Sequence, residues 1–207
     1  MVSRSSRHRL FAALWDRATA HETASMQRAR SQVVGHASGR VLELGTGVGT
    51  NWQFLPADIQ YIGLEPDPSM AGRDNRHAAE QRRSLALIQA RAEDLPIAGN
   101  SVDTIVVTLS LCSVSDLTAA LSEAKRVLKP GGELRFWEHV RPNGAAARLF
   151  DLLTPVWRRV GAGCILNRRT AEAIEAAAFQ VHLDRRFTMA GLPMILGVAT
   201  KPAGGPP

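Results

Sequence analysis

The sequence predicts an α/β fold in which a mostly parallel sheet carries helices on both faces. Five short apolar runs alternate with segments of helical character between residues 41 and 137, and this alternation is typical of a doubly wound sheet. A glycine-rich turn directly follows the first apolar run, where such a fold binds its ligand. Two further strand-like runs near the end of the chain bring the expected sheet to seven strands. At 207 residues the chain has the size of one ordinary domain.

The first forty residues are predicted to form a basic helical segment. Residues 1–40 contain seven arginines against Asp16 and Glu22, so most of the net charge of +6 lies there. We expect a helix over residues 7–34, and its apolar face comprises Leu10, Phe11, Leu14, Trp15 and Ala18. Packing near the mouth of the site is the favoured interpretation, with peripheral contact at a membrane surface as the alternative. No nucleic-acid partner is expected, because the segment carries no recognised binding motif.

The first strand, Val41–Leu44, runs into a turn with glycines at alternate positions, Gly45, Gly47 and Gly49. Backbone N–H groups in such a turn can approach a ligand closely, because no Cβ stands in the way. The dinucleotide fingerprint G-x-G-x-x-G would need a glycine at position 50, where the sequence has Thr50. The sequence therefore argues against a nicotinamide-dependent oxidoreductase, which we keep as an alternative interpretation.

The middle of the chain is expected to continue the alternation of helices and strands. The pattern predicts a short helix over Asn51–Leu55, a strand over Tyr61–Leu64, a helix from Pro68 to about Arg83, strands over Leu85–Gln89 and Val102–Leu109, a helix over Asp116–Leu128 and a strand over Glu133–Trp137. Asp67 and Ser115 are the expected N-caps of the two longer helices. The sequence Pro130-Gly131-Gly132 is expected to end the second of these helices and turn the chain.

The last seventy residues are expected to complete the sheet. They predict helical pieces over Ala145–Leu153 and Pro155–Val160, a helix over Thr170–Ala178, and strands over Gln180–Thr188 and Met194–Thr200. Pro155 is expected to separate the first two pieces, because proline lacks the backbone N–H of a helix interior. Residues 41–202 are thus expected to form one domain, and residues 203–207 a disordered tail.

The first strand and its turn, Glu43-x-Gly45-x-Gly47-x-Gly49, resemble the first motif of the class I S-adenosylmethionine (SAM) methyltransferases. In that family the ligand carries no pyrophosphate, so a carboxylate at Glu43 can face the sulfonium and ammonium of the methionine part. The resemblance implies SAM as the cofactor and a Rossmann-like sheet whose last two strands form a closing antiparallel hairpin. The cofactor site that it implies comprises Glu43, Gly45, Thr46, Gly47, Gly49, Asn51, Glu65, Pro66, Ala92, Glu93, Thr108 and Leu109.

Two acidic stretches support the nucleoside side of this site. Glu65 ends the second strand 20 residues after Gly45, and a carboxylate there can accept hydrogen bonds from both ribose hydroxyls. The loop that begins at Ala92 resembles the adenine-binding segment of the family. Many relatives carry an acidic residue where this chain has Arg91, so adenine recognition is expected from the backbone around Ala92 and from Glu93 or Asp94.

Five further blocks resemble the methyltransferase-like branch that contains the animal thiol S-methyltransferases. They are residues 51–56, 64–68, 108–114, 136–140 and 163–164, and those with Cys112-Ser113-Val114 and Trp137-Glu138-His139-Val140 are more particular than the glycine motif. The resemblance implies a small lipophilic acceptor, with a thiol preferred and a quinone, phenol or lipid as the alternative. Animal members carry an N-terminal hydrophobic anchor that we do not find in this sequence. The expected setting is therefore cytoplasmic, without a signal peptide or a transmembrane helix.

His139 is the candidate catalytic residue, as a base or as a group that orients the acceptor. Imidazole titrates near neutral pH, and a thiol acceptor needs only partial deprotonation. A structural hydrogen bond in the turn is the alternative role. Neither Cys112 nor Cys164 has a histidine or second cysteine at ligand spacing, so we expect no metal site and interpret both as small buried hydrophobic residues. A non-catalytic protein that binds a nucleotide or a partner on the same fold is the alternative of another class.

Overall fold

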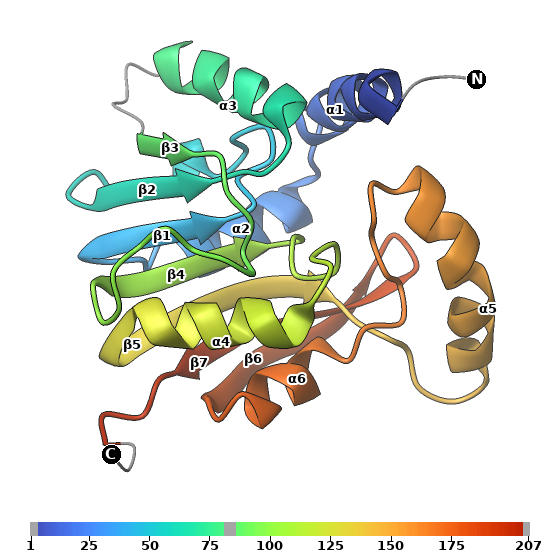
Figure 1. Cartoon of the computed structure of the whole chain (residues 1–207). Coiled ribbons are helices and arrows are strands. Elements are labelled where there is room, and N and C mark those ends of the chain that lie inside the picture. The colour runs from blue at the N-terminus through green and yellow to red at the C-terminus, as the bar shows by residue number, and fades with distance from the viewer. Residues whose placement is uncertain (1–3, 81–85, 205–207) are drawn as a thin grey trace.

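The strands form one sheet in the order β3-β2-β1-β4-β5-β7-β6 in the computed structural model, which describes residues 4–80 and 86–204 (Figure 1). The strands are β1 (Arg40–Leu44), β2 (Gln60–Leu64), β3 (Ala86–Ile88), β4 (Val102–Thr108), β5 (Leu128–His139), β6 (Gln180–Met189) and β7 (Leu192–Thr200). Strands β1 to β5 pair in parallel, whereas β7 is antiparallel to both β5 and β6. The predicted parallel sheet with its closing antiparallel hairpin is confirmed.

Helices cover both faces of this sheet, because successive strand residues point to opposite sides. The helices are α1 (Arg4–Thr19), α2 (Ala24–Val34), the 3-10 turn η1 (Trp52–Phe54), α3 (Pro68–Glu80), α4 (Leu117–Val127), α5 (Ala145–Val160) and α6 (Thr170–Ala176). Leu42 and Ile105 pack toward α4 and α6, while Val41 and Val106 pack toward α2. Figure 1 shows α4 and α6 in front of the sheet and α2 behind it.

The predicted single helix over residues 7–34 is wrong, since the chain breaks between α1 and α2. Thr23 is the N-cap of α2, and its hydroxyl accepts a hydrogen bond from the Met26 N–H at 3.4 Å. The two helices also pack on different parts of the domain. Ala29 and Val33 of α2 are buried against the sheet, whereas Ala12 of α1 packs beside the glycine turn.

The boundaries around α4 and β5 differ from those expected. Asp116 caps α4 instead of Ser115, because its carboxylate accepts from the Ala119 N–H at 3.1 Å. Strand β5 begins at Leu128, five residues before the predicted Glu133. The glycines at 131 and 132 pair with Lys201 through backbone hydrogen bonds of 2.9 Å, so this segment extends the sheet.

Helix α5 runs without interruption through Pro155, against the predicted break. The proline removes only one donor, and the Thr154 hydroxyl donates to the Phe150 carbonyl at 2.7 Å within the same turn. Ala147 is the buried residue of this exposed helix, so a local distortion there disturbs little packing. Helix α6 ends at Ala176, two residues earlier than expected.

Three expectations fall partly outside the described residues. These are the end of α3 near Arg83, the start of β3 at Leu85 and the last residues of the tail. Among the described helices, none is long and apolar enough to cross a membrane.

Candidate active site

The glycine turn lies at the carboxyl end of β1 and is held from two sides. The N–H groups of Gly45 and Thr46 donate to the Leu64 carbonyl at 2.8 and 3.1 Å, which ties the turn to β2. Gly45 has φ +73°, and a Cβ on it would lie 2.6 Å from Cβ of Ser110. A side chain at Gly45 would therefore push the turn away from the segment that follows β4.

Gly47 presents the open side of the same turn. Its φ is +61°, and the nearest atom to a Cβ built there is Trp15 Nε1 at 4.0 Å. Among the described residues, no atom other than Trp15 Nε1 thus lies within 4 Å of the space in front of this glycine. A ligand can reach the backbone at this point, as the sequence predicts for a cofactor cradle.

Glu65 lies beside Gly47 at the carboxyl end of β2. One carboxylate oxygen accepts from the Gly47 N–H at 2.9 Å, and the other accepts from the Asp67 N–H at 2.8 Å. Burial raises the pKa of Glu65 to about 7, although these backbone hydrogen bonds act in the opposite direction. An acidic group next to an open glycine suits a ribose with two hydroxyl donors, so the residues present fit a nucleoside.

Glu43 lies beneath the turn and has both carboxylate oxygens engaged. Asn51 Nδ2 donates to Oε1 at 2.7 Å, and the Tyr61 hydroxyl donates to Oε2 at 2.7 Å. Burial raises the pKa of Glu43 to about 7. In this arrangement Glu43 links the segment after the turn, through Asn51, to β2, through Tyr61.

Arg30 of α2 completes this buried network, although the sequence did not lead us to predict it as a site residue. Its Nη1 donates to Asn51 Oδ1 at 2.7 Å and to the Thr108 hydroxyl at 3.2 Å, and its Nε donates to Glu22 at 3.1 Å. Asn51 also donates to Thr108 at 3.0 Å. The position of Arg30 on the apolar face of α2, beside Ala29 and Val33, is the feature of the sequence that could have indicated its burial. A buried arginine needs carboxylate or carbonyl partners, and here it links α2 to the ends of β1 and β4.

The residues that are predicted to contact adenine differ in their exposure. Ala92 is buried, and Pro66 is exposed directly after Glu65. The Glu93 carboxylate accepts from the Ser115 N–H at 2.8 Å and the Asp116 N–H at 3.2 Å, so it fixes this loop to the start of α4. Leu109 has φ +57°, and its N–H donates to the Trp137 carbonyl at 2.8 Å, which turns the chain at the end of β4.

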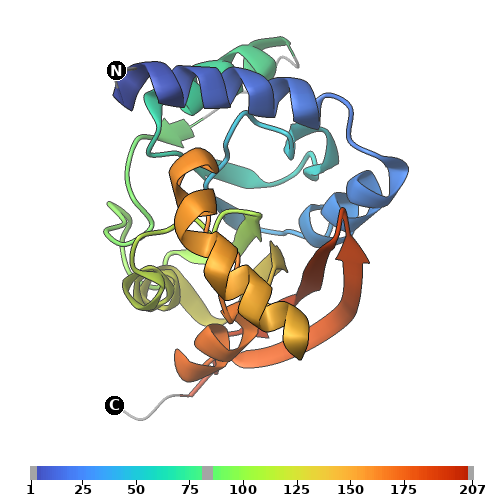
Figure 2. The ribbon, with the colours of Figure 1, turned by 90° about the vertical axis from the view of Figure 1, so that its right-hand side faces the viewer.

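Helix α1 covers the glycine turn. Ala12 packs against Val48 and Met70, and Asp16 pairs with Arg73 of α3 at 3.1 Å. Figure 2 looks at the carboxyl ends of the parallel strands and shows α1 and α5 on this same side. The expectation that the N-terminal helix packs near the mouth of the site agrees with this placement.

Three of the five blocks that resemble the thiol S-methyltransferase branch meet at the carboxyl ends of β4 and β5. His139, the last residue of β5, has Nε2 at 3.1 Å from Cys164 Sγ. The ligand atoms of Cys112, His139 and Cys164 all lie within 4.8 Å of one another. The interpretation of both cysteines as small buried hydrophobic residues did not anticipate this contact, because residues far apart in the sequence converge here. Cys164 is also only half-buried, unlike the buried Cys112.

Glu138 and the loop after α5 fix the positions of these groups. Glu138 is fully buried, and its carboxylate accepts from the N–H groups of Ser110, Leu111 and Cys112 at 2.8, 2.9 and 3.3 Å. The Cys112 carbonyl accepts from the Ile165 N–H at 2.9 Å, which joins the backbones on either side of the two sulfurs. The cysteine loop is thus held by the strand that carries His139.

The cluster shifts the pKa values of its own members. A hydrogen bond from the Cys112 thiol, and a further one from His139, lower the pKa of Cys164, although burial acts against them. The pKa of Cys112 rises, because its proton is shared with Cys164 and its side chain is buried. Burial lowers the pKa of His139, but the Cys164 contact outweighs it and the pKa rises. The thiol of Cys164 is therefore more readily ionised than that of Cys112.

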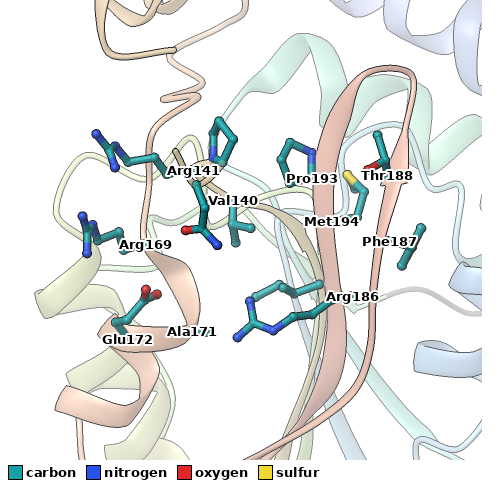
Figure 3. Close-up of a pocket in the computed structure, with 13 residues that line it drawn as sticks. Val140, Arg141, Arg169, Ala171, Glu172, Arg186, Phe187, Thr188, Pro193 and Met194 are labelled. Carbon is teal, nitrogen blue, oxygen red and sulfur yellow. The ribbon is translucent and has the colours of Figure 1, made fainter. Parts of the chain in front are cut away.

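A hollow of about 340 Å³ begins at Val140, the residue after His139. Figure 3 shows Arg141 and Arg169 on one wall and Phe187 and Met194 on the other. The hollow thus combines apolar surface with basic groups, and its lining begins one residue after His139 in the chain.

Comparison with known proteins places this site in a family. Residues 42–136 match the family described as "Methyltransferase domain". The chain is 40% identical over 164 residues to thiol S-methyltransferase TMT1B of Homo sapiens, covering 72% of this chain and 65% of that protein. It is 41% identical over 183 residues to the TMT1B of Mus musculus, covering 79% of this chain and 72% of that protein. The chain thus spans less than two thirds of the length of the human relative.

The fold has close counterparts among solved structures. The YcgJ protein of Bacillus subtilis superposes with a TM-score of 0.73 at 18% identity, covering 87% of this chain and 99% of YcgJ. Such low identity shows the fold alone. Together with the glycine turn and the identity to TMT1B, it leads to one assignment. The chain belongs to the class I SAM-dependent methyltransferases, in the branch of the thiol S-methyltransferases TMT1A and TMT1B.

Proposed function

We propose that this chain transfers a methyl group from SAM to the sulfur of a small lipophilic thiol. The observation that carries the proposal is the nearness of two sites at one edge of the sheet. The open glycine turn with Glu65 follows β1 and β2, and the cluster around His139 follows β4 and β5. In open α/β sheets ligands bind at the carboxyl ends of the strands, beside the point where the strand order reverses.

The cofactor half would hold SAM through the turn and the strand end of β2. Gly47 leaves room for the ligand, and the Glu65 carboxylate accepts hydrogen bonds from the ribose hydroxyls. Gly45, Thr46 and Gly49 shape the turn, while the remaining cofactor residues of the prediction support it. Those are Glu43, Asn51 and Thr108 beneath the turn, Pro66, Ala92 and Glu93 toward the adenine, and Leu109 beside the methionine part.

The acceptor half would orient the nucleophile. SAM, when bound, supplies a methyl group on a sulfonium, which is a good leaving group, so alignment of the acceptor does much of the work. His139 is buried, and its Nε2 contacts Cys164 at 3.1 Å, which favours the orienting role over that of a free base. The hollow lined by Phe187 and Met194 offers apolar contact to the rest of the acceptor.

A quinone, phenol or lipid acceptor is the alternative within the same chemistry. One face of α5 leaves large apolar side chains exposed, which suits delivery of a lipophilic molecule. They are Leu149, Leu152, Leu153, Val156, Trp157 and Val160. Helix α1, on the same side of the domain, exposes Leu10 and Leu14. We include peripheral membrane contact through this basic helix, and a cytoplasmic setting, in the proposal. Flotation with anionic vesicles tests the contact, and full recovery of the protein in the lipid-free fraction would contradict it.

The test of the function is transfer of labelled methyl from SAM to a panel of small thiols, phenols and quinols. We expect selective labelling of thiols by the wild-type chain and none by Gly47→Arg, which fills the open side of the turn. Labelling of quinols or phenols in preference to thiols would favour the alternative acceptors. SAM binding without labelling of any acceptor would point to a binding protein on this fold.

A further inference from the structure

The cluster of Cys112, His139 and Cys164 is a set of soft and borderline metal ligands on three separate segments. Cys112 follows β4, His139 ends β5, and Cys164 lies in the loop after α5. Each belongs to one of the five sequence blocks that resemble the thiol S-methyltransferase branch. The cofactor half accounts for none of the three, so they require an explanation of their own.

The donor set and its spacing match one class of ion. Two cysteine sulfurs and one imidazole nitrogen are typical ligands of Zn²⁺, and catalytic zinc sites use three protein ligands with a fourth position open. Tetrahedral coordination at Zn–S distances of about 2.3 Å puts neighbouring ligand atoms roughly 3.5 to 4 Å apart. The three ligand atoms here lie within 4.8 Å of one another, so small side-chain movements suffice to close a site.

The backbone that carries the ligands is already fixed. Glu138 holds the N–H of Cys112 at 3.3 Å, and Ile165 and Arg168 donate to the Cys112 carbonyl at 2.9 and 3.2 Å. On the other side, the Cys164 N–H donates to the Gly161 carbonyl at 3.0 Å. These contacts fix ligand positions without using the sulfur or nitrogen atoms that would bind the ion.

We propose that Cys112, His139 and Cys164 bind one Zn²⁺ ion, and that its fourth position takes the sulfur of the acceptor. The first half of the proposal stands on the cluster alone, and the second rests on the proposed function. Access is on the side of Cys164, because Cys112 and His139 are buried and Cys164 is half-buried. His139 then orients the acceptor through the ion.

Methyl transfer at this site would need no reagent other than SAM and the thiol acceptor. The acceptor R–SH binds through sulfur and releases its proton to solvent, which leaves a thiolate at neutral pH. The bond between the SAM sulfonium and its methyl carbon breaks as the bond from the acceptor sulfur to that carbon forms. The products are the methyl thioether R–S–CH₃ and S-adenosylhomocysteine.

A disulfide between Cys112 and Cys164 is the competing use of the same atoms. It would release two protons and two electrons to an oxidant such as a hydroperoxide. It would give His139 no role, because a disulfide uses the two sulfur atoms alone. Zinc is the better match, because it uses His139 Nε2, which lies 3.1 Å from the Cys164 sulfur, together with both sulfurs.

The experiment measures metal content of the whole chain purified under reducing conditions in the presence of Zn²⁺. We expect one zinc per chain, removal by a chelator, and recovery on adding Zn²⁺ back. Cys112→Ser, Cys164→Ser and His139→Ala should each lose the stoichiometric ion. His182→Ala, which changes an exposed histidine on β6, is the matched control and should keep it. Chelator-stripped wild type separates loss of metal from failure of a variant to fold.

Co²⁺ in place of Zn²⁺ reports the ligands directly. We expect a sulfur-to-cobalt charge-transfer band that weakens in each cysteine variant, and visible bands of tetrahedral cobalt that change when a small thiol is added without SAM. Absence of stoichiometric metal in the reduced wild type would overturn the proposal. So would zinc retained by all three variants, or a wild-type mass lower by two hydrogens with no metal bound.

The outcomes separate the two proposals. Stoichiometric zinc and a thiol-sensitive cobalt spectrum without methyl transfer would uphold the metal site and contradict the proposed function. Thiol methylation at an unchanged rate by the stripped chain would uphold the function and overturn the open-position half of the inference.

Discussion

The cofactor half and the acceptor half of this edge are built in different ways. The turn from Gly45 to Gly49 is one contiguous segment after β1, and Glu65, which accepts from the Gly47 N–H, follows the neighbouring strand β2. The cluster of Cys112, His139 and Cys164 comes from three segments that only the sheet and the loop after α5 bring together. A contiguous motif identifies the first half, whereas long-range packing creates the second.

Two buried glutamates, Glu65 and Glu138, also differ between the cofactor half and the acceptor half. Glu65 and Glu138 both end or nearly end a parallel strand, both accept backbone N–H groups, and burial raises the pKa of each to about 7. Glu65 is 6% exposed beside an open glycine, whereas Glu138 is 0% exposed beneath the cysteine loop. Both acids organise backbone, and we expect ligand binding only from Glu65, where a neighbouring glycine leaves space.

The largest expected effect comes from closing the cofactor half alone. In Gly47→Arg the side chain enters the open side of the turn, and the positive φ adds about 1–2 kcal/mol of backbone strain. We expect SAM affinity to fall at least about 100-fold by calorimetry, since the side chain occupies the ligand's space. Gly191→Arg is the matched control, because its φ is +79° in a hairpin turn with open space around it. Equal loss of affinity in both variants would refute the comparison.

The next effect should leave the cofactor half intact. His139→Ala removes the acceptor-side group, so we expect turnover with a thiol to fall about 100-fold while the SAM dissociation constant changes less than about twofold. Single-turnover kinetics and SAM titration on the same preparation give both numbers. Unchanged turnover on the true acceptor would remove His139 from the mechanism.

A smaller effect concerns the pH dependence of the cofactor half. The pKa of Glu65 in the folded chain is about 7 because burial outweighs its hydrogen bonds, and only the ionised carboxylate accepts from two ribose hydroxyls. SAM affinity should therefore rise about tenfold between pH 6 and 8, and Glu65→Gln should flatten this dependence. An affinity that is constant over this range would show that the carboxylate is not a ligand.

The same pKa has an opposite effect on the free protein. Between the unfolded value of 4.5 and the folded value of about 7, the native state binds the extra proton, so stability falls as pH rises through this window. Ligand affinity and stability thus move in opposite directions, which distinguishes ligand binding by Glu65 from a general loss of structure.

Much of the fold was predictable because local signals agree with the tertiary arrangement. The apolar runs of β1 and β4 are nearly continuous, and the turn after β1 needs its glycines. Boundaries failed where side chains or distant strands decide them, as at the Asp116 cap or the pairing of Gly131 with Lys201.

The site was predictable to a lesser degree. The sequence predicts Gly47 from the glycine motif and Glu65 from the end of the second strand, and the structure places these two residues in contact. It missed Arg30, whose partners at Asn51 and Thr108 lie on other elements. It also missed the meeting of Cys112 with Cys164, since nothing in their spacing signals proximity. Such contacts depend on the assembled sheet.

The most direct test measures both halves on the same two variants, Gly47→Arg and Cys164→Ser. SAM affinity and zinc content are determined for each beside the wild-type chain. We expect Gly47→Arg to lose SAM binding and keep one zinc, and Cys164→Ser to keep SAM binding and lose zinc. Loss of SAM binding in Cys164→Ser, or loss of zinc in Gly47→Arg, in chains that remain folded, would contradict the division into a cofactor half and an acceptor half.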